Sequence, residues 1–190
     1  MSTVPPRKLA GMRIRRPPGR ENPQRTVLSN APIPKTAATH VPQTEASWMV
    51  HWAHLLLNTQ RGRLIYSESA NRSELFHCKP GIVPSGTHAD CSQFYAACAK
   101  WAGVKKVTDK DYTGTLLQKG LLISKPEPGC CVIFGPGTGT HAGMATEKVG
   151  NDWWIVGFGH QGAPDRVLLS QLKAYFAGAG HPGVRYLRFS

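Results

Sequence analysis

One cysteine and two histidines could form a catalytic group in which the cysteine is the nucleophile and a histidine is its base. Cys91 follows Asp90 at the expected start of a helix. His141 opens one segment of strand character, and His160 closes the next. The unpaired N–H groups and the dipole of a helix start favour a thiolate, and a nearby imidazole can accept the thiol proton. The pattern predicts a thiol hydrolase in which Cys91 attacks, His141 is the base and His160 orients the His141 ring.

The group that orients the base has a second candidate. Gln161 follows His160 directly, and its side-chain carbonyl could equally accept the ring N–H of His141. We favour His160 and keep Gln161, together with Asp90, among the residues expected to line the substrate and oxyanion region. No metal or organic cofactor is required by this chemistry.

The elements expected to position these groups are mostly helices first and strands afterwards. Four helices are expected, at residues 47–59, 91–102, 111–120 and 165–176. Ser47 is expected to cap the first helix and Asp165 the last. The apolar face of the first helix would consist of Trp48, Trp52, Leu55 and Leu56. Strands are expected at residues 130–134, 141–147, 153–158 and 184–189, between Gly, Pro and Asn turns. This arrangement predicts an α+β domain.

The first 45 residues differ in composition from the rest of the chain. They hold eight Lys and Arg against two acidic residues, and eight of the fifteen prolines. Such a segment has too little apolar surface to offset the entropy of ordering it. We therefore expect residues 1–45 to be a flexible basic extension and residues 46–190 to be the folded domain.

Composition also excludes several classes of protein. The apolar stretch at residues 9–12 is too short for a secretory signal peptide, and no run approaches the length of a membrane span. The five cysteines include the adjacent pair Cys130 and Cys131, which is unlike the disulfide framework of a secreted domain. Synthesis in a reducing cytoplasm is the simplest expectation.

Six short motifs, in order, resemble those of the NlpC-type cysteine peptidases, and most closely the peptidase domains of phage endolysins that attack actinobacterial walls. They are IYSESANR at 65–72, ADCSQF at 89–94, YTGTLL at 112–117, PGCCVIFG at 128–135, HAGM at 141–144 and GHQGAP at 159–164. The resemblance implies a papain-like fold and cleavage of amide bonds in the stem peptides of bacterial peptidoglycan. It also implies that Tyr66 belongs to the site, where its hydroxyl would stabilise the oxyanion with the Cys91 backbone N–H.

Two residues depart from the pattern of that family. Cys130 stands where an aspartate usually follows Pro-Gly, and Gln93 stands where a small residue often follows Cys-Ser. The first change is expected to remove a structural hydrogen bond. Neither change touches Cys91 or His141, so the predicted chemistry is retained.

Three alternatives remain beside the hydrolase. A zinc site could use His77, Cys78, His88, Asp90 and Cys91, although the chain has no Cys-x-x-Cys pair and no His-Glu-x-x-His motif. The basic run at 13–16 lacks the interleaved aromatic residues of a nucleic-acid module, so we expect a solvated tail, an arm attracted to the wall or a membrane surface, or a segment that docks onto phage virion proteins. A virion component could also keep this fold for binding alone. The predicted hydrolase would be made in the host cytoplasm and act at the cell wall or in a virion.

Overall fold

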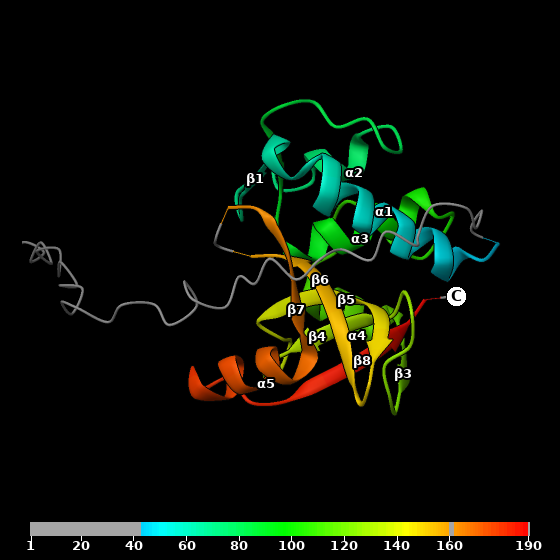
Figure 1. Cartoon of the computed structure of the whole chain (residues 1–190). Coiled ribbons are helices and arrows are strands. Elements are labelled where there is room, and N and C mark those ends of the chain that lie inside the picture. The colour runs from blue at the N-terminus through cyan, green and yellow to red at the C-terminus, as the bar shows by residue number, and fades with distance from the viewer. Residues whose placement is uncertain (1–42, 160–161, 190) are drawn as a thin grey trace, which may run out of the picture. The chain divides into compact units, whose positions relative to one another are not determined.

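A six-stranded antiparallel sheet with helices on both faces forms the frame of the domain (Figure 1). The computed structural model describes residues 43–159 and 162–189. The helices are α1 (Glu45–Thr59), α2 (Glu74–His77), α3 (Cys91–Trp101), α4 (Thr113–Lys119) and α5 (Leu169–Gly178), with the 3₁₀ turn η2 (Arg61–Arg63) after α1. The α+β class predicted from the sequence is confirmed.

The strands form two separate sheets. They are β1 (Leu64–Tyr66), β2 (Thr87–Ala89), β3 (Leu121–Ile123), β4 (Cys131–Phe134), β5 (His141–Val149), β6 (Asp152–Phe158), β7 (Pro164–Leu168) and β8 (Val184–Arg188). The large sheet has the order β3-β8-β4-β5-β6-β7, and β1 pairs with β2 in parallel. The strand predictions for β4, β5, β6 and β8 are confirmed to within two residues.

Helix α1 begins earlier than the sequence indicated. Thr44, not Ser47, is its N-cap: the Thr44 hydroxyl accepts from the Ser47 N–H at 3.1 Å, while Ser47 Oγ accepts from the Thr44 N–H at 2.9 Å. This reciprocal pair is a capping box. The buried face of the helix is also different, because Met49, Ala53 and Leu56 point into the core while Trp48 is only half-buried.

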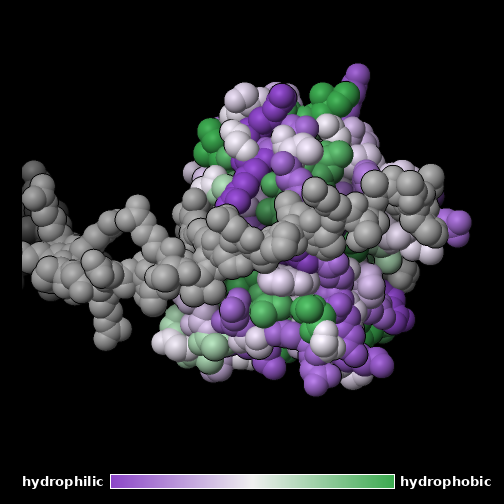
Figure 2. Space-filling view, in the orientation of Figure 1, coloured by the Kyte–Doolittle hydropathy of each residue, from purple (hydrophilic) through white to green (hydrophobic). Residues whose placement is uncertain are grey.

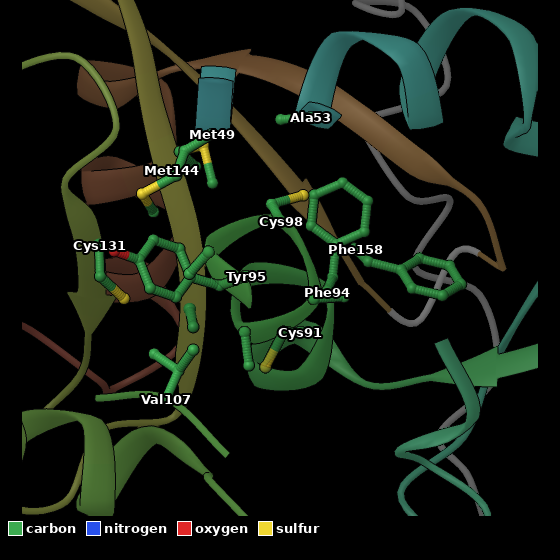
Figure 3. Close-up of a cluster of buried hydrophobic side chains, with 14 of the residues drawn as sticks. Met49, Ala53, Cys91, Phe94, Tyr95, Cys98, Val107, Cys131, Met144 and Phe158 are labelled. Atoms are coloured by element: carbon green, nitrogen blue, oxygen red, sulfur yellow. The ribbon is translucent and has the colours of Figure 1, made fainter. Parts of the chain in front are cut away.

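The sheet separates two hydrophobic clusters because successive residues of a strand face opposite sides. Cys131 and Ile133 of β4 join the larger cluster with α1 and α3, whereas Val132 and Phe134 join a smaller cluster that includes residues of α5. Every residue of α3 from Ser92 to Ala99 is buried. Figure 3 shows this larger cluster, with Cys91 at the first turn of α3.

The segment after residue 163 corrects one prediction. Asp165 was expected to cap a helix, but it lies inside β7, which pairs with β6, and α5 begins only at Leu169. The N–H and C=O groups on the outer side of β6 need partners, and this segment supplies them. Strand pairing of this kind overrides local propensity.

The surface of the described residues has both hydrophobic and hydrophilic side chains. Figure 2 shows hydrophobic residues interspersed with hydrophilic ones over the visible face. The large apolar side chains with the highest exposure are Ile82, Leu121 and Leu122. Within the described residues, no helix is both long and apolar enough to cross a membrane.

Candidate active site

The end of β2, which pairs in parallel with β1, places Cys91 at the first turn of α3. Strand β2 ends at Ala89, and Asp90 follows in an extended conformation as the N-cap. Asp90 Oδ1 accepts from the Gln93 N–H at 2.7 Å, which satisfies one of the unpaired donors of the helix start. Cys91 is therefore the first residue of a buried helix, as the sequence predicted, and only 7% of its surface is exposed.

The thiol of Cys91 is held protonated by its surroundings. Burial and the Asp90 carboxylate raise its pKa from 9.0 to about 11, although the N–H groups of Ala142 and Ser92 and the Tyr66 hydroxyl act in the opposite direction through hydrogen bonds. At neutral pH the resting group is therefore a thiol rather than a thiolate. A base must remove its proton as the sulfur attacks.

Tyr66 is the second predicted site residue that the structure brings to Cys91. It lies opposite Ala89 in the β1–β2 register, and its ring packs edge-on against Phe158 at 5.4 Å between centroids. Its hydroxyl donates to Glu68 Oε1 at 3.0 Å. Burial, followed by the charges of Cys91 and the carboxylates nearby, raises the pKa of the phenol. Tyr66 therefore keeps its proton and acts as a donor.

His141 is the first residue of β5 and precedes Ala142, whose backbone N–H helps to lower the pKa of Cys91. Its ring stacks on Phe176 of α5, with 5.5 Å between centroids and 22° between planes. Gly157 on β6 lies beside the ring, because a Cβ added there would lie 3.4 Å from His141 Nε2, in ordinary van der Waals contact. The assignment of His141 as the base stays a prediction.

The two candidates for the orienting group, His160 and Gln161, lie outside the described residues. Their neighbours on either side, Gly159 and Gly162, are described. An added Cβ at Gly159 would lie 4.0 Å from His141 Cε1. The loop that carries both candidates therefore leaves β6 directly beside the His141 ring.

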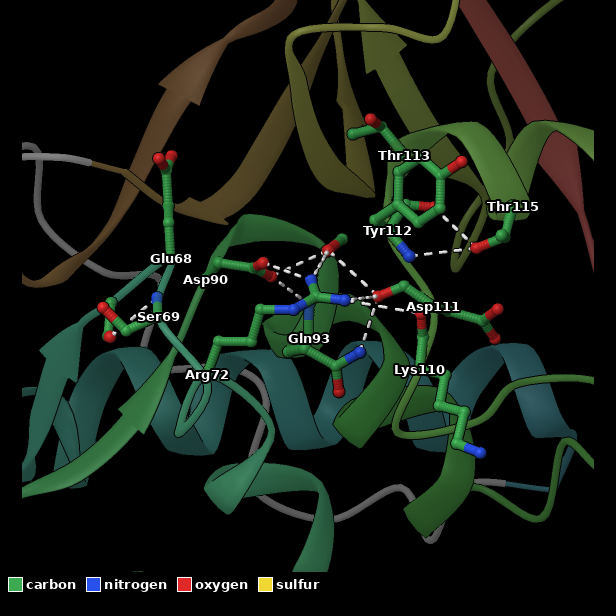
Figure 4. Close-up of polar contacts among 12 residues, drawn as sticks. Glu68, Ser69, Arg72, Asp90, Gln93, Lys110, Asp111, Tyr112, Thr113 and Thr115 are labelled. Atoms are coloured by element: carbon green, nitrogen blue, oxygen red, sulfur yellow. Dashed lines mark hydrogen bonds and ion pairs between the residues drawn. The ribbon is translucent and has the colours of Figure 1, made fainter.

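Asp90 is also held by a polar cluster that the sequence did not reveal. We call it the Arg72 clamp, and it consists of Arg72, Asp90, Ser92, Gln93 and Asp111 (Figure 4). The Arg72 guanidinium pairs with the Asp90 carboxylate and donates to the Asp111 carbonyl at 3.1 Å. Gln93 Nε2 donates to that same carbonyl at 2.6 Å. The clamp joins the start of α3 to the segment before α4.

The Asp90 carboxylate is thus occupied by protein donors. Besides Arg72 and the Gln93 N–H, it accepts from Ser92 Oγ at 2.7 Å. Its observed contacts are those of a helix cap and an ion-pair partner, and its predicted contact with substrate stays a prediction. Gln93, which the family resemblance marked as unusual, is fully buried, and its Oε1 has no hydrogen-bond partner.

Three of the four remaining thiols belong to the core. Cys98, Cys130 and Cys131 are all 2% exposed or less, and burial raises the pKa of each. They behave as small hydrophobic residues. No disulfide links the five cysteines, all of which lie within the described residues.

The histidines of the alternative zinc site have carboxylate partners. His77 Nε2 lies 3.2 Å from Asp109 Oδ2, and His88 Nδ1 lies 2.7 Å from Glu74 Oε2. Among the residues that the structure describes, no three His, Cys, Asp or Glu side chains gather in a way that could hold a metal ion.

Comparison with known proteins adds no relative. No protein-family model matches the chain, and neither the curated proteins nor the solved structures give a match. Function is therefore inferred from the six motifs and from the surroundings of Cys91.

Proposed function

We propose that this protein is a papain-like cysteine hydrolase of the NlpC type that cleaves amide bonds in the stem peptides of bacterial peptidoglycan. One observation carries the proposal: Cys91 is the first residue of a buried helix, capped by Asp90. The N–H groups of Ser92 and Ala142 and the hydroxyl of Tyr66 act to lower the pKa of its thiol. Such donors stabilise negative charge on a sulfur or on an adjacent oxyanion.

The proposed reaction follows from these groups. The base, which we assign to His141, takes the proton from the Cys91 thiol as the sulfur attacks the amide carbonyl carbon. The carbonyl oxygen becomes an oxyanion, for which the Tyr66 hydroxyl and the Cys91 N–H are the donors. The C–N bond then breaks as the imidazolium gives its proton to the leaving amine. Water hydrolyses the thioester and restores the thiol.

The motif HAGM supports the assignment of His141 as the base. His141 directly precedes Ala142, whose backbone N–H helps to lower the pKa of Cys91, while the His141 ring packs on Phe134 and Phe176 beside the smaller cluster. Since burial and Asp90 keep Cys91 protonated, the base acts during the attack and not by forming a resting ion pair. Catalytic contacts of this kind often tighten only when substrate is bound.

The substrate class comes from the family resemblance. The six motifs extend from residue 65 to residue 164 and include the nucleophile, the predicted base and Tyr66. They support a stem peptide of an actinobacterial wall as the substrate, and no cofactor is needed. Free action during lysis and action from within a virion are both compatible with this chemistry.

A binding protein without activity is the second candidate. The observation that favours it is the 7% exposure of Cys91 together with a thiol pKa of about 11. A virion component could use the same fold to recognise the wall or another virion protein. In that case Cys91 would be a core cysteine at a helix cap.

Digestion of purified actinobacterial peptidoglycan separates the two candidates. The wild-type protein should release peptide fragments whose masses identify the bond that is cut, and Cys91→Ser should release none. Cys98→Ala is the matched control, because it removes a fully buried thiol from the same helix. It should keep most of the activity at a cost of about 1 kcal/mol in stability. Fragments released equally by Cys91→Ser would refute the proposed nucleophile.

A further inference from the structure

Tyr112 lies where the start of α3 meets the segment before α4. The residue before it, Asp111, accepts at its carbonyl from Gln93 Nε2 at 2.6 Å, and that carbonyl oxygen lies 3.3 Å from Ser92 Oγ (Figure 4). Ser92 directly follows Cys91. The backbone on this side of Tyr112 is therefore fixed to the first turn of the helix that carries the proposed nucleophile.

The residue after Tyr112 is fixed to the turn that leads into β5. Thr113 Oγ1 donates to the Gly139 carbonyl at 3.2 Å, and Gly139 lies two residues before His141. The Tyr112–Thr113 segment thus joins the parts of the chain that carry the proposed nucleophile and the predicted base. A substrate peptide that reaches both groups must pass close to this segment.

Gly114 determines where the Tyr112 ring lies. A Cβ added at Gly114 would lie 2.6 Å from Tyr112 Cε2 and 3.1 Å from Tyr112 Cζ, so the ring rests on the Gly114 backbone. It would also lie 3.2 Å from Thr138 Cβ. Gly114 is inside α4 and has no positive φ, so its backbone conformation does not require glycine. Since glycine is unfavourable in a helix, the space that the ring occupies explains this glycine.

Although the ring is held in this way, 46% of Tyr112 is exposed. A tyrosine ring in a fixed place offers a large apolar contact area to a ligand at a low cost in conformational entropy. We propose that Tyr112 is a substrate-binding residue whose ring packs against the substrate peptide beside the scissile amide bond, and that Gly114 holds the ring in position. The inference rests on the proposed function, because it concerns how the same site holds its substrate.

The test is the binding of a soluble stem peptide to the full-length Cys91→Ala protein, measured by isothermal titration calorimetry. In this parent, Tyr112→Ala should raise the Kd of the peptide roughly tenfold or more, as the loss of an aromatic anchor does. Tyr112→Phe keeps the ring and should bind within about twofold of the parent. With Cys91 present, Tyr112→Ala should raise KM by a similar factor and change kcat by less than about twofold, because the ring takes no part in bond breaking.

Gly114→Ala moves the ring without removing it. The added methyl group must displace the Tyr112 ring, so this variant should bind the peptide nearly as weakly as Tyr112→Ala. The double variant should match Tyr112→Ala within about twofold, because no ring is left to displace. A double variant that binds much more weakly than Tyr112→Ala would overturn the role of Gly114, since the methyl group would then act through Thr138.

Leu122→Ala is the matched control, because it removes a side chain that is 63% exposed on β3 and should bind as the parent does. Equal affinity in Tyr112→Ala and the parent would overturn the inference and leave the hydrolase intact. The absence of any binding to the parent would also overturn it. A peptide that needs Tyr112 for binding, but that the wild-type protein does not cleave, would refute the hydrolase and leave this inference intact.

Discussion

Replacing Arg72 by methionine should destabilise the domain by about 2 to 3 kcal/mol. The side chains of Arg72 and Asp90 are 21% and 10% exposed, so the pair is neither fully buried nor at the open surface, and its energy should lie between those of the two kinds of ion pair. Breaking a buried pair costs about 3 to 5 kcal/mol, because one charge is left without its partner, whereas a surface pair contributes about 1 kcal/mol or less. Asp90 would keep its hydrogen bonds from Ser92 Oγ and the Gln93 N–H, so the loss of stability should be smaller than for a fully buried ion pair.

Urea unfolding followed by tryptophan fluorescence measures this loss. With a slope of about 2 kcal/mol per molar urea, the midpoint should fall by roughly 1 to 1.5 M. Arg72→Lys keeps the charge but cannot reach both Asp90 and the Asp111 carbonyl with a planar fork, so it should lose about half as much. Lys148→Met, at the exposed end of β5, is the control and should change stability by less than about 0.5 kcal/mol. A loss below about 1 kcal/mol in Arg72→Met would show that the clamp does not hold the start of α3.

Two further outcomes follow from the site. The alkylation rate of wild-type Cys91 should rise about tenfold per pH unit from pH 7 to pH 10, without a plateau. The pKa of the thiol in the folded protein is raised from 9.0 to about 11, so the fraction of thiolate keeps growing over this whole range. A plateau below pH 8 would indicate a resting thiolate–imidazolium pair instead. Gly157→Val extends beyond a Cβ that already lies 3.4 Å from His141 Nε2, so it should displace the ring and slow wall digestion roughly tenfold or more. Gly157→Ala, whose methyl group makes only an ordinary contact with the ring, should digest walls at close to the wild-type rate, and equal rates in the two variants would separate His141 from the chemistry.

The sequence was informative where a residue and its partner are close along the chain. The helical spacing of the apolar residues after Cys91 predicted α3 correctly, because that spacing is a local pattern. The structure adds Asp90 as the cap, which accepts from the Gln93 N–H three residues away. The strands β4 and β6 were found from runs of β-branched and aromatic residues between turns. Cys91 was likewise expected at the helix start, and it is the first residue of α3.

The sequence was uninformative where partners are distant. Arg72 meets Asp90 at a separation of 18 residues and the Asp111 carbonyl at 39, and no local pattern encodes such a meeting. The segment around Asp165 has the composition of a helix start, yet the unpaired side of β6 draws it into the sheet.

Intact-protein mass spectrometry of an acid-quenched reaction tests the central claim most directly. If Cys91 is the nucleophile, protein mixed with a soluble stem peptide should carry the mass of the acyl fragment, and the adduct should map to the peptide that contains Cys91. Cys98→Ala should form the same adduct, and Cys91→Ala should form none and release no amine. Hydrolysis that continues in Cys91→Ala, or an acyl group on any other residue of the wild-type protein, would contradict the account.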